Sequence, residues 1–274
     1  MSKSSRQDRW AVIADLVGSG DADKIDASQV PEPKRDDSVF ERQPRPSVAV
    51  AELLRTQDML VSGGHLDRTF DDEYRRIKRS LLANAFGPIA PKTESGNLVL
   101  ITSSLPGEGK THTSVNLALS IAQETYHSAL LVDCDVTNKG MSHLLNLFGE
   151  EGLLDLLEDD DLSIADVLVR TDIPNLSVLP AGKHHEHVTE LLASQRMASL
   201  VNEMASHYSD RVIIFDGPPL IGTPETPGLA DLVGQVLLVV EAGTTPQDVV
   251  EEAFALVPIE KAIGLVMNKT EGRF

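Results

Sequence analysis

Residues 104–111 carry side chains whose types and order suit the binding of phosphate groups. The segment reads Ser-Leu-Pro-Gly-Glu-Gly-Lys-Thr, between an apolar run and a helical pattern, which is the context that such a loop requires. Gly107 and Gly109 let backbone N–H groups turn inward around phosphate, and the helix N-terminus adds partial positive charge. Lys110 is expected to reach the β and γ oxygens of a nucleotide, and the Thr111 hydroxyl to bind Mg²⁺. The alternative is an ordinary Gly-rich turn, which the Gly-Lys-Thr run disfavours.

The predicted nucleotide-binding residues therefore form one nearly continuous set along the loop and the start of the helix. Ser104 stands where the usual pattern has its first glycine, which is a tolerable exchange because serine is also small. The set comprises Ser104, Pro106, Gly107, Glu108, Gly109, Lys110, Thr111 and His112.

Three aspartates should join this site because each follows an apolar strand pattern. Asp133 and Asp135 end the run Leu-Leu-Val-Asp-Cys-Asp, and Asp216 ends Val-Ile-Ile-Phe-Asp. In open α/β sheets ligands bind at the carboxyl ends of strands, so the motifs should converge. We expect Asp216 and Asp135 to hold Mg²⁺ with Thr111, and Asp133 or Asp135 to accept a proton from an attacking hydroxyl. Lys110, Asp133 and Asp135 are thus the predicted catalytic residues; a solvated strand end is the alternative for the Asp133–Asp135 pair.

The pattern around these motifs predicts an α/β fold. Apolar runs at 97–102, 129–132, 176–179, 211–215, 235–240 and 262–267 read as strands. Helical patterns occupy 71–86, 111–123, 188–207 and 247–256, with shorter pieces near 141–147, 153–157 and 164–169. Strands that are apolar on both faces and alternate with helices indicate a mostly parallel sheet covered by helices on both faces, as in the P-loop NTPase fold.

The first quarter of the chain differs from the rest. Residues 18–45 are rich in Gly, Ser, Asp, Lys and Pro, and we expect them to be mostly disordered. An apolar island at 10–17 is a candidate amphipathic helix, either for a partner or for loose packing on the chain's own core. A helical periodicity covers 48–61. We therefore expect an N-terminal extension over 1–66 and a nucleotide-binding domain over 67–274.

Composition narrows the class of protein. The 274 residues include 24 basic and 42 acidic side chains, so the formal net charge is 24 − 42 = −18. This acidity argues against binding to nucleic acid or to an anionic membrane surface. No apolar run approaches the ~18 residues of a membrane helix, and the start lacks an apolar signal core, so we expect a cytoplasmic protein. The single cysteine, Cys134, excludes an intrachain disulfide and is expected to fill the core.

Taken together, these motifs resemble the bacterial tyrosine kinases of polysaccharide export, closest to the tyrosine autokinases of exopolysaccharide/PEP-CTERM loci. The resemblance covers roughly residues 67–269. It rests on the loop at 102–111, on 132–135 and 215–219, on 179–182 with 189–194, and on the Glu-x-x-Arg-x-x-Arg element formed by Glu73, Arg76 and Arg79.

The resemblance implies an activity, cofactors and partners. It implies Mg-ATP-dependent phosphorylation of protein tyrosine in exopolysaccharide biosynthesis or export, with ATP and Mg²⁺ at the site. It implies a homo-oligomer that assembles as a ring through Glu73, Arg76 and Arg79; an intrahelical Glu–Arg pair is the alternative. It also implies a membrane-anchored polysaccharide co-polymerase as activator, which recruits the kinase to the membrane. Asn268, after the last strand, lies where related nucleotide-binding proteins read the base; a strand-capping Asn is the alternative.

Two departures from the family pattern matter. Thr137 stands where the family's second motif has an arginine, so a cationic contact is missing or supplied elsewhere. The family's C-terminal tyrosine cluster is also absent, since the only tyrosines are Tyr74, Tyr126 and Tyr208. All three fall in predicted helices or at their ends, so we expect weak autophosphorylation, or use of Tyr74, and a substrate in another protein.

Three other functions remain open at this point. A partition or septum-positioning ATPase would share the fold, but it carries a second lysine near the start of the loop, where this chain has Leu105. An iron-protein reductase needs two cysteines per subunit to hold its cluster, and one is present. A pseudo-kinase scaffold that binds nucleotide and regulates a membrane partner is the third alternative.

Overall fold

A computed structural model describes residues 47–57, 59, 68–87, 95–183, 185–207 and 210–270. The expected helix at 10–17, the expected disordered stretch at 18–45 and Tyr208 lie outside these residues. Among the helices of the described parts, none combines the length and the apolar character that a membrane crossing demands.

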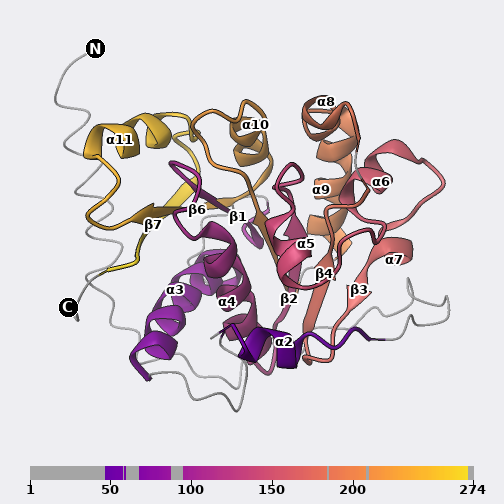
Figure 1. Cartoon of the computed structure of the whole chain (residues 1–274), viewed down its shortest axis with the longest axis horizontal. Coiled ribbons are helices and arrows are strands. Elements are labelled where there is room, and N and C mark those ends of the chain that lie inside the picture. Colours follow the sequence, from indigo (N-terminus) through magenta and orange to yellow (C-terminus); the bar gives the residue numbers. More distant parts are fainter. Residues whose placement is uncertain are drawn as a thin grey trace.

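The described chain folds around a seven-stranded sheet in the order β3-β4-β2-β5-β1-β6-β7 (Figure 1). Every neighbouring pair is parallel except β3 with β4. The strands are β1 (Leu98–Ser103), β2 (Ser128–Asp133), β3 (Val169–Arg170), β4 (Leu176–Leu179), β5 (Arg211–Asp216), β6 (Gln235–Glu241) and β7 (Ala262–Asn268). This confirms the predicted mostly parallel α/β fold.

Alternate residues of the central strands enter two separate hydrophobic cores. In β1, Leu98 and Leu100 belong to one core, whereas Val99 and Ile101 belong to the other. Successive side chains of a strand point to opposite faces, so strands that are apolar throughout need cover on both sides. The central position of β1, β2 and β5 follows from this pattern.

Helices supply that cover on both faces (Figure 1). The core on one face includes residues of α2 (Ala51–Arg55), α3 (Arg68–Phe86), α4 (Lys110–Ala122) and α5 (Gly140–Leu144). The core on the other face includes residues of α6 (Leu153–Glu158), α7 (Ile164–Val167), α8 (Val188–Leu192), α9 (Gln195–His207), α10 (Glu225–Leu232) and α11 (Gln247–Ala255).

Two expectations about helices were wrong in detail. The helix predicted over 188–207 is divided into α8 and α9 because the Ser194 hydroxyl accepts a hydrogen bond from Met197 N at 3.1 Å and so begins a new helix. In the described part of the helix predicted over 48–61, α2 alone is helical, and Val48 instead forms a bridge with Thr171.

Residues before the expected domain boundary pack onto the domain. Val50 and Leu54 are fully buried, and the Asp172 carboxylate accepts hydrogen bonds from the N–H groups of Val50 and Ala51 at 2.8 and 3.0 Å. This contact ties α2 to the region after β3. The boundary expected between residues 66 and 67 lies outside the described residues and stays a prediction.

Candidate functional site

The three predicted motifs meet at the carboxyl ends of three adjacent strands. In the sheet, β5 lies between β1 and β2, and Asp133 and Asp216 are directly paired in the register of β2 and β5. The loop after β1 leads into α4, which opens with Lys110. The structure therefore brings Lys110, Asp133, Asp135 and Asp216 together, as the sequence predicted.

Glycine is required at two positions of the loop. Gly107 and Gly109 have φ of 85° and 96°, a left-handed conformation that disfavours other residues. A Cβ at Gly109 would lie 2.0 Å from Asn268 Nδ2, and that same nitrogen donates to the Glu108 carbonyl at 2.8 Å. Asn268 thus lies against the loop, and its side chain holds the loop backbone in this structure.

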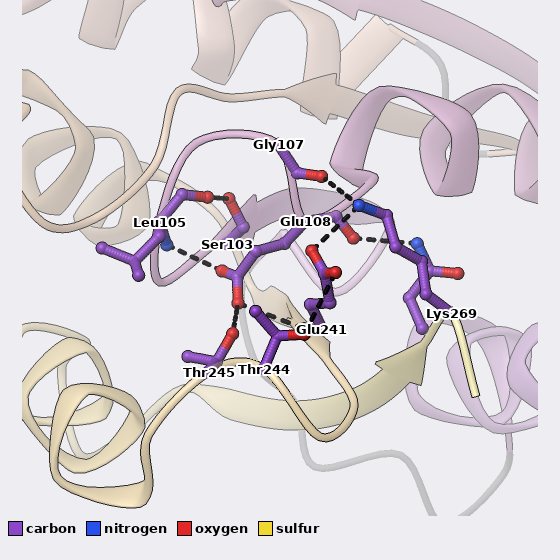
Figure 2. A network of polar contacts seen from close by, with 9 residues as sticks. Ser103, Leu105, Gly107, Glu108, Glu241, Thr244, Thr245 and Lys269 are labelled. Carbon is purple, nitrogen blue, oxygen red and sulfur yellow. Dashed lines mark hydrogen bonds and ion pairs between the residues drawn. The ribbon is translucent and has the colours of Figure 1, made fainter. Parts of the chain in front are cut away.

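A network of polar contacts fixes the loop to β6 and β7 (Figure 2). The Glu108 carboxylate, nearly fully buried, accepts hydrogen bonds from Leu105 N at 2.7 Å, from Glu241 N at 3.1 Å and from the Thr245 hydroxyl. Lys269 donates to the Gly107 carbonyl at 2.9 Å and pairs with the Glu241 carboxylate at 2.9 Å. The hydrogen bond from Lys269 lowers the pKa of Glu241. The Glu108 side chain therefore positions the loop.

Lys110 forms a buried ion pair with Asp135. The Nζ–Oδ2 distance is 2.8 Å, and the two side chains are 11% and 3% exposed. The Asn138 amide donates to the other oxygen of Asp135 at 2.9 Å. Thr137, at the position of the family's arginine, is exposed, so the polar contact to Asp135 from this segment comes from Asn138.

Asp133 and Asp216 are buried carboxylates, and in each of them one of the two oxygens accepts hydrogen bonds from serine. The Ser142 N–H and hydroxyl donate to Asp133 Oδ2 at 2.8 and 2.6 Å, and the Ser114 hydroxyl donates to Asp216 Oδ1 at 2.9 Å. Asp133 Oδ1 and Asp216 Oδ2 have no hydrogen-bond partner among the described atoms. The alternative of a solvated strand end for Asp133 and Asp135 is wrong, since both are buried.

Burial raises the pKa of both carboxyl groups. The pKa of Asp133 rises to about 6, opposed by the hydrogen bonds from Ser142. The pKa of Asp216 rises to about 7, first through burial and then through repulsion by Asp133, opposed by the Thr111 and Ser114 hydroxyls and by Lys110. One lysine therefore faces more negative charge than it can neutralise, and the site is suited to an additional cation.

The donor set fits Mg²⁺ that arrives with a nucleotide. Within the described residues, no three His, Cys, Asp or Glu side chains converge to hold a metal ion by themselves. Mg²⁺ commonly keeps several waters and uses one or two carboxylates plus substrate phosphates. The unpartnered oxygen of Asp216, with the neighbouring Thr111 hydroxyl, offers oxygen ligands of that kind.

The remaining predicted nucleotide-binding residues differ in their surroundings. Pro106 is exposed, and the Ser104 hydroxyl is buried without a hydrogen-bond partner among the described atoms. The His112 ring contacts Asn116 one turn along α4 at 3.2 Å, and burial lowers its pKa. Sequence reasoning missed Ser114 and Ser142; Ser114 lies one helical turn after Lys110, whereas no motif marks Ser142.

The helix α3 presents the predicted oligomerisation residues to solvent. Glu73, Arg76 and Arg79 are exposed, and no ion pair joins them to one another in the described structure, so the intrahelical pair is not formed there. The opposite side of α3 is anchored on α4 and on the turn after it: Lys78 donates to the Ser120 carbonyl of α4 at 3.0 Å and pairs with Glu124 of the turn.

The loop between β1 and α4, the lysine that begins α4 and the aspartates at the ends of β2 and β5 define a nucleotide-binding protein of the P-loop class. A family model described as an AAA domain matches residues 97–245. The tyrosine-protein kinase CpsD of Streptococcus agalactiae is 30% identical over 179 residues, which cover 64% of this chain and 75% of CpsD. The chain therefore belongs to the family of bacterial tyrosine-protein kinases that share this domain.

Two further comparisons agree with that assignment. The kinase domain of VpsO has 30% sequence identity and a TM-score of 0.58, with coverage of 74% of this chain and 99% of that domain. The succinoglycan biosynthesis transport protein ExoP of Rhizobium meliloti is 33% identical over 181 residues, which cover 64% of this chain but 22% of ExoP.

Proposed function

We propose that this chain is an Mg-ATP-dependent protein tyrosine kinase that regulates exopolysaccharide biosynthesis or export. The observation that carries the proposal is the buried Lys110–Asp135 pair at the phosphate loop, beside the unpartnered oxygens of Asp133 and Asp216. The names of relatives that match most of the domain support tyrosine as the acceptor, and the name of ExoP supports the polysaccharide context.

The chain's own residues would promote phosphoryl transfer by positioning the reactants and by neutralising charge. Backbone N–H groups of the loop and of the α4 N-terminus orient the phosphates, and Lys110 exchanges its contact with Asp135 for the β and γ oxygens. Asp133, whose pKa of about 6 leaves it ionised near neutral pH, accepts the proton of the tyrosine hydroxyl. Thr111, Asp135 and Asp216 would hold Mg²⁺, which when bound neutralises charge on the phosphates.

The partition or septum-positioning ATPase is the weaker candidate. It requires a second lysine near the start of the loop, where Leu105 stands. Tyrosine kinase names among the relatives favour the kinase. A scaffold that binds nucleotide without phosphoryl transfer would form no phosphotyrosine on the copolymer used in the test.

Assembly and location belong to the same proposal. The exposed face of α3 with Glu73, Arg76 and Arg79 is the proposed contact between copies in a ring. A membrane-anchored polysaccharide co-polymerase is the proposed activator, which would recruit a cytoplasmic kinase to the inner face of the membrane. Nucleic acid is not among the proposed partners, because a chain with a net charge of −18 repels a polyanion.

The test is phosphotyrosine formation with Mg-ATP on a random Glu–Tyr copolymer. We expect the parent to phosphorylate the copolymer and Lys110→Ala to lose both phosphoryl transfer and most nucleotide affinity, because no other lysine lies at the start of α4. Lys183→Ala is the matched control, since this exposed lysine pairs with Glu151 and should not affect transfer. Turnover of ATP by the parent with no phosphotyrosine on any protein or on the copolymer would contradict the kinase assignment.

A further inference from the structure

We propose that Tyr126, in the turn between α4 and β2, is an acceptor of the phosphoryl group and that it is phosphorylated by a second copy of the chain. This inference rests on the proposed kinase function and adds the acceptor site to it. It also reverses the expectation that Tyr74 is the residue used.

Accessibility separates the two tyrosines that the structure describes. Tyr74 is 6% exposed on α3, and burial raises its pKa to about 12, opposed by contacts with Thr113 and Asn116 on α4. Its hydroxyl could reach another active site only after α3 had separated from α4, which costs the free energy of local unfolding. Tyr126 is 68% exposed, so its hydroxyl is available in the folded state.

The backbone around Tyr126 is already outside regular structure. The helix α4 ends at Ala122 and β2 begins at Ser128, so residues 123–127 form a short connection in which Gln123 and Thr125 are also exposed. Contacts on both sides hold this connection: Glu124 pairs with Lys78, and the His127 ring stacks on Phe86 with 4.6 Å between centroids. These contacts leave the Tyr126 side chain largely in solvent.

The geometry excludes transfer within one molecule. Lys110 begins α4 and Tyr126 lies beyond its other end, and a helix of 13 residues spans about 20 Å. The strand β2 likewise separates Ser128 from Asp133. The turn therefore lies at the end of the sheet where the parallel strands begin, and the phosphate loop lies at the end where they finish. Because α4 and β2 would both have to unfold to close this distance, the phosphoryl donor must be bound to another copy.

The transfer itself needs no further reactant. The phenolic oxygen of Tyr126 forms a bond to the γ phosphorus of ATP held by the second copy, and the bond from that phosphorus to the β–γ bridging oxygen breaks. ADP leaves with the bond's electron pair, and the phenolic proton passes to Asp133 of the copy acting as enzyme and then to solvent. The product carries added negative charge two residues after Glu124.

The experiment mixes active chain with an inactive acceptor. Isotopically labelled Lys110→Ala chain is incubated with unlabelled parent and Mg-ATP, and mass spectrometry reads phosphate on Tyr126 of the labelled chain. We expect this phosphate to appear, and its initial rate to rise in proportion to parent concentration. Asp216→Asn serves as a second inactive acceptor, so a folding defect of one variant does not decide the result.

Matched variants and the copolymer separate the possible failures. Adding Tyr126→Phe to the acceptor should remove most of the incorporated phosphate, whereas adding Tyr74→Phe should leave it unchanged. Copolymer phosphorylation without phosphate on Tyr126 of either acceptor would overturn this inference and leave the kinase function standing. Phosphate on Tyr126 of the parent alone would overturn transfer between copies. Absence of phosphotyrosine from both chain and copolymer would overturn the kinase function as well.

Discussion

At the scale of single residues, the site holds more buried negative charge than the protein itself compensates. Lys110 pairs with Asp135, while Asp133 and Asp216 each keep one unpartnered oxygen. Leaving a buried charge unpaired is costly, and nearby cations relieve the cost. The nucleotide-free fold is thus destabilised at the place where a cation and a nucleotide would bind.

The first prediction concerns the charge of Asp216. Asp216→Asn should stabilise the nucleotide-free protein by roughly 1–3 kcal/mol near pH 8, because it removes a buried charge whose burial cost the Thr111 and Ser114 hydroxyls and Lys110 offset in part. The same variant should lose activity and much of its Mg²⁺ dependence. Denaturant unfolding and a Mg²⁺ titration of activity measure the two effects. A variant less stable than the parent would show that the carboxylate is not under strain.

The pH dependence has a definite sign. The folded pKa of Asp216 is about 7 against an ordinary value of 3.8, so between these values the folded state holds a proton that the unfolded state has lost. Stability of the nucleotide-free parent should therefore fall as pH rises from about 4 to about 7. The decline should be shallower in Asp216→Asn, with a remainder from Asp133, whose pKa is about 6. Unfolding curves at several pH values test this directly.

The charged residues of the site could be predicted from the sequence, but their hydrogen-bond partners could not. The aspartates were predictable because strand ends are readable from apolar runs, and Gly-Lys-Thr is a specific pattern. Ser142 was not, because it reaches Asp133 only after α5 folds back over the end of β2. The Ser142 hydroxyl also accepts a hydrogen bond from Ala181 N at 3.0 Å. The sequence spacing of Asp133, Ser142 and Ala181 does not predict that they are in contact.

At the scale of elements, the phosphate loop depends on the ends of two other strands. Glu108 is held by the backbone at Glu241 and by the Thr245 hydroxyl, and Lys269 joins the loop to Glu241 (Figure 2). Glu241 ends β6, Thr245 follows it and Lys269 follows β7, and all three are far from the loop in sequence. The loop conformation is therefore set by the edge of the sheet that carries β7 as well as by its own glycines.

The second prediction tests this support. Glu108→Gln keeps the shape of the side chain but places an amide N–H₂ against groups that donate, so ATP affinity should fall about tenfold, equivalent to about 1.4 kcal/mol. Thr245→Val removes one hydrogen bond and should give a smaller loss. Glu251→Gln on α11 is the control, since that exposed carboxylate accepts a hydrogen bond from Gln247 on the same helix. Calorimetric titration with ATP measures the affinities.

An unchanged ATP affinity in Glu108→Gln would show that the loop holds its form without the carboxylate. A loss of thermal stability equal in all three variants would instead indicate a general structural effect. The maximal rate at saturating ATP should change less than the affinity, because Glu108 acts through the loop and not on the phosphoryl group.

Element boundaries were predictable where periodicity is strong and failed where it is weak. The strands of the sheet that were predicted from apolar runs agree with them within a residue or two, and β1, β2, β5 and β6 are buried almost throughout. The helix α10 was not anticipated, since its sequence Glu-Thr-Pro-Gly-Leu-Ala-Asp-Leu contains Pro227 and Gly228, which disfavour a helix interior. The two-residue strand β3 is too short to produce a pattern.

At the scale of the whole molecule, transfer to Tyr126 requires two copies to meet, and α3 offers the surface by which they could do so. One side of α3 is fixed on α4 through Tyr74 and Lys78. Its other side exposes Glu73, Arg76 and Arg79. In a chain with a net charge of −18, an exposed pair of arginines has favourable targets on a second copy, because acidic side chains dominate the surface charge.

The third prediction addresses that contact. Arg76→Glu with Arg79→Glu should reduce assembly in sedimentation velocity and slow phosphorylation of Tyr126 on an inactive acceptor. Activity on the copolymer should stay near the parental rate, because α3 supplies no residue to the phosphate loop. Arg75→Glu is the matched control, since Arg75 pairs with Asp71 and Asp72 within α3. If the double variant assembles like the parent and still modifies Tyr126 at the parental rate, the copies must meet through another face.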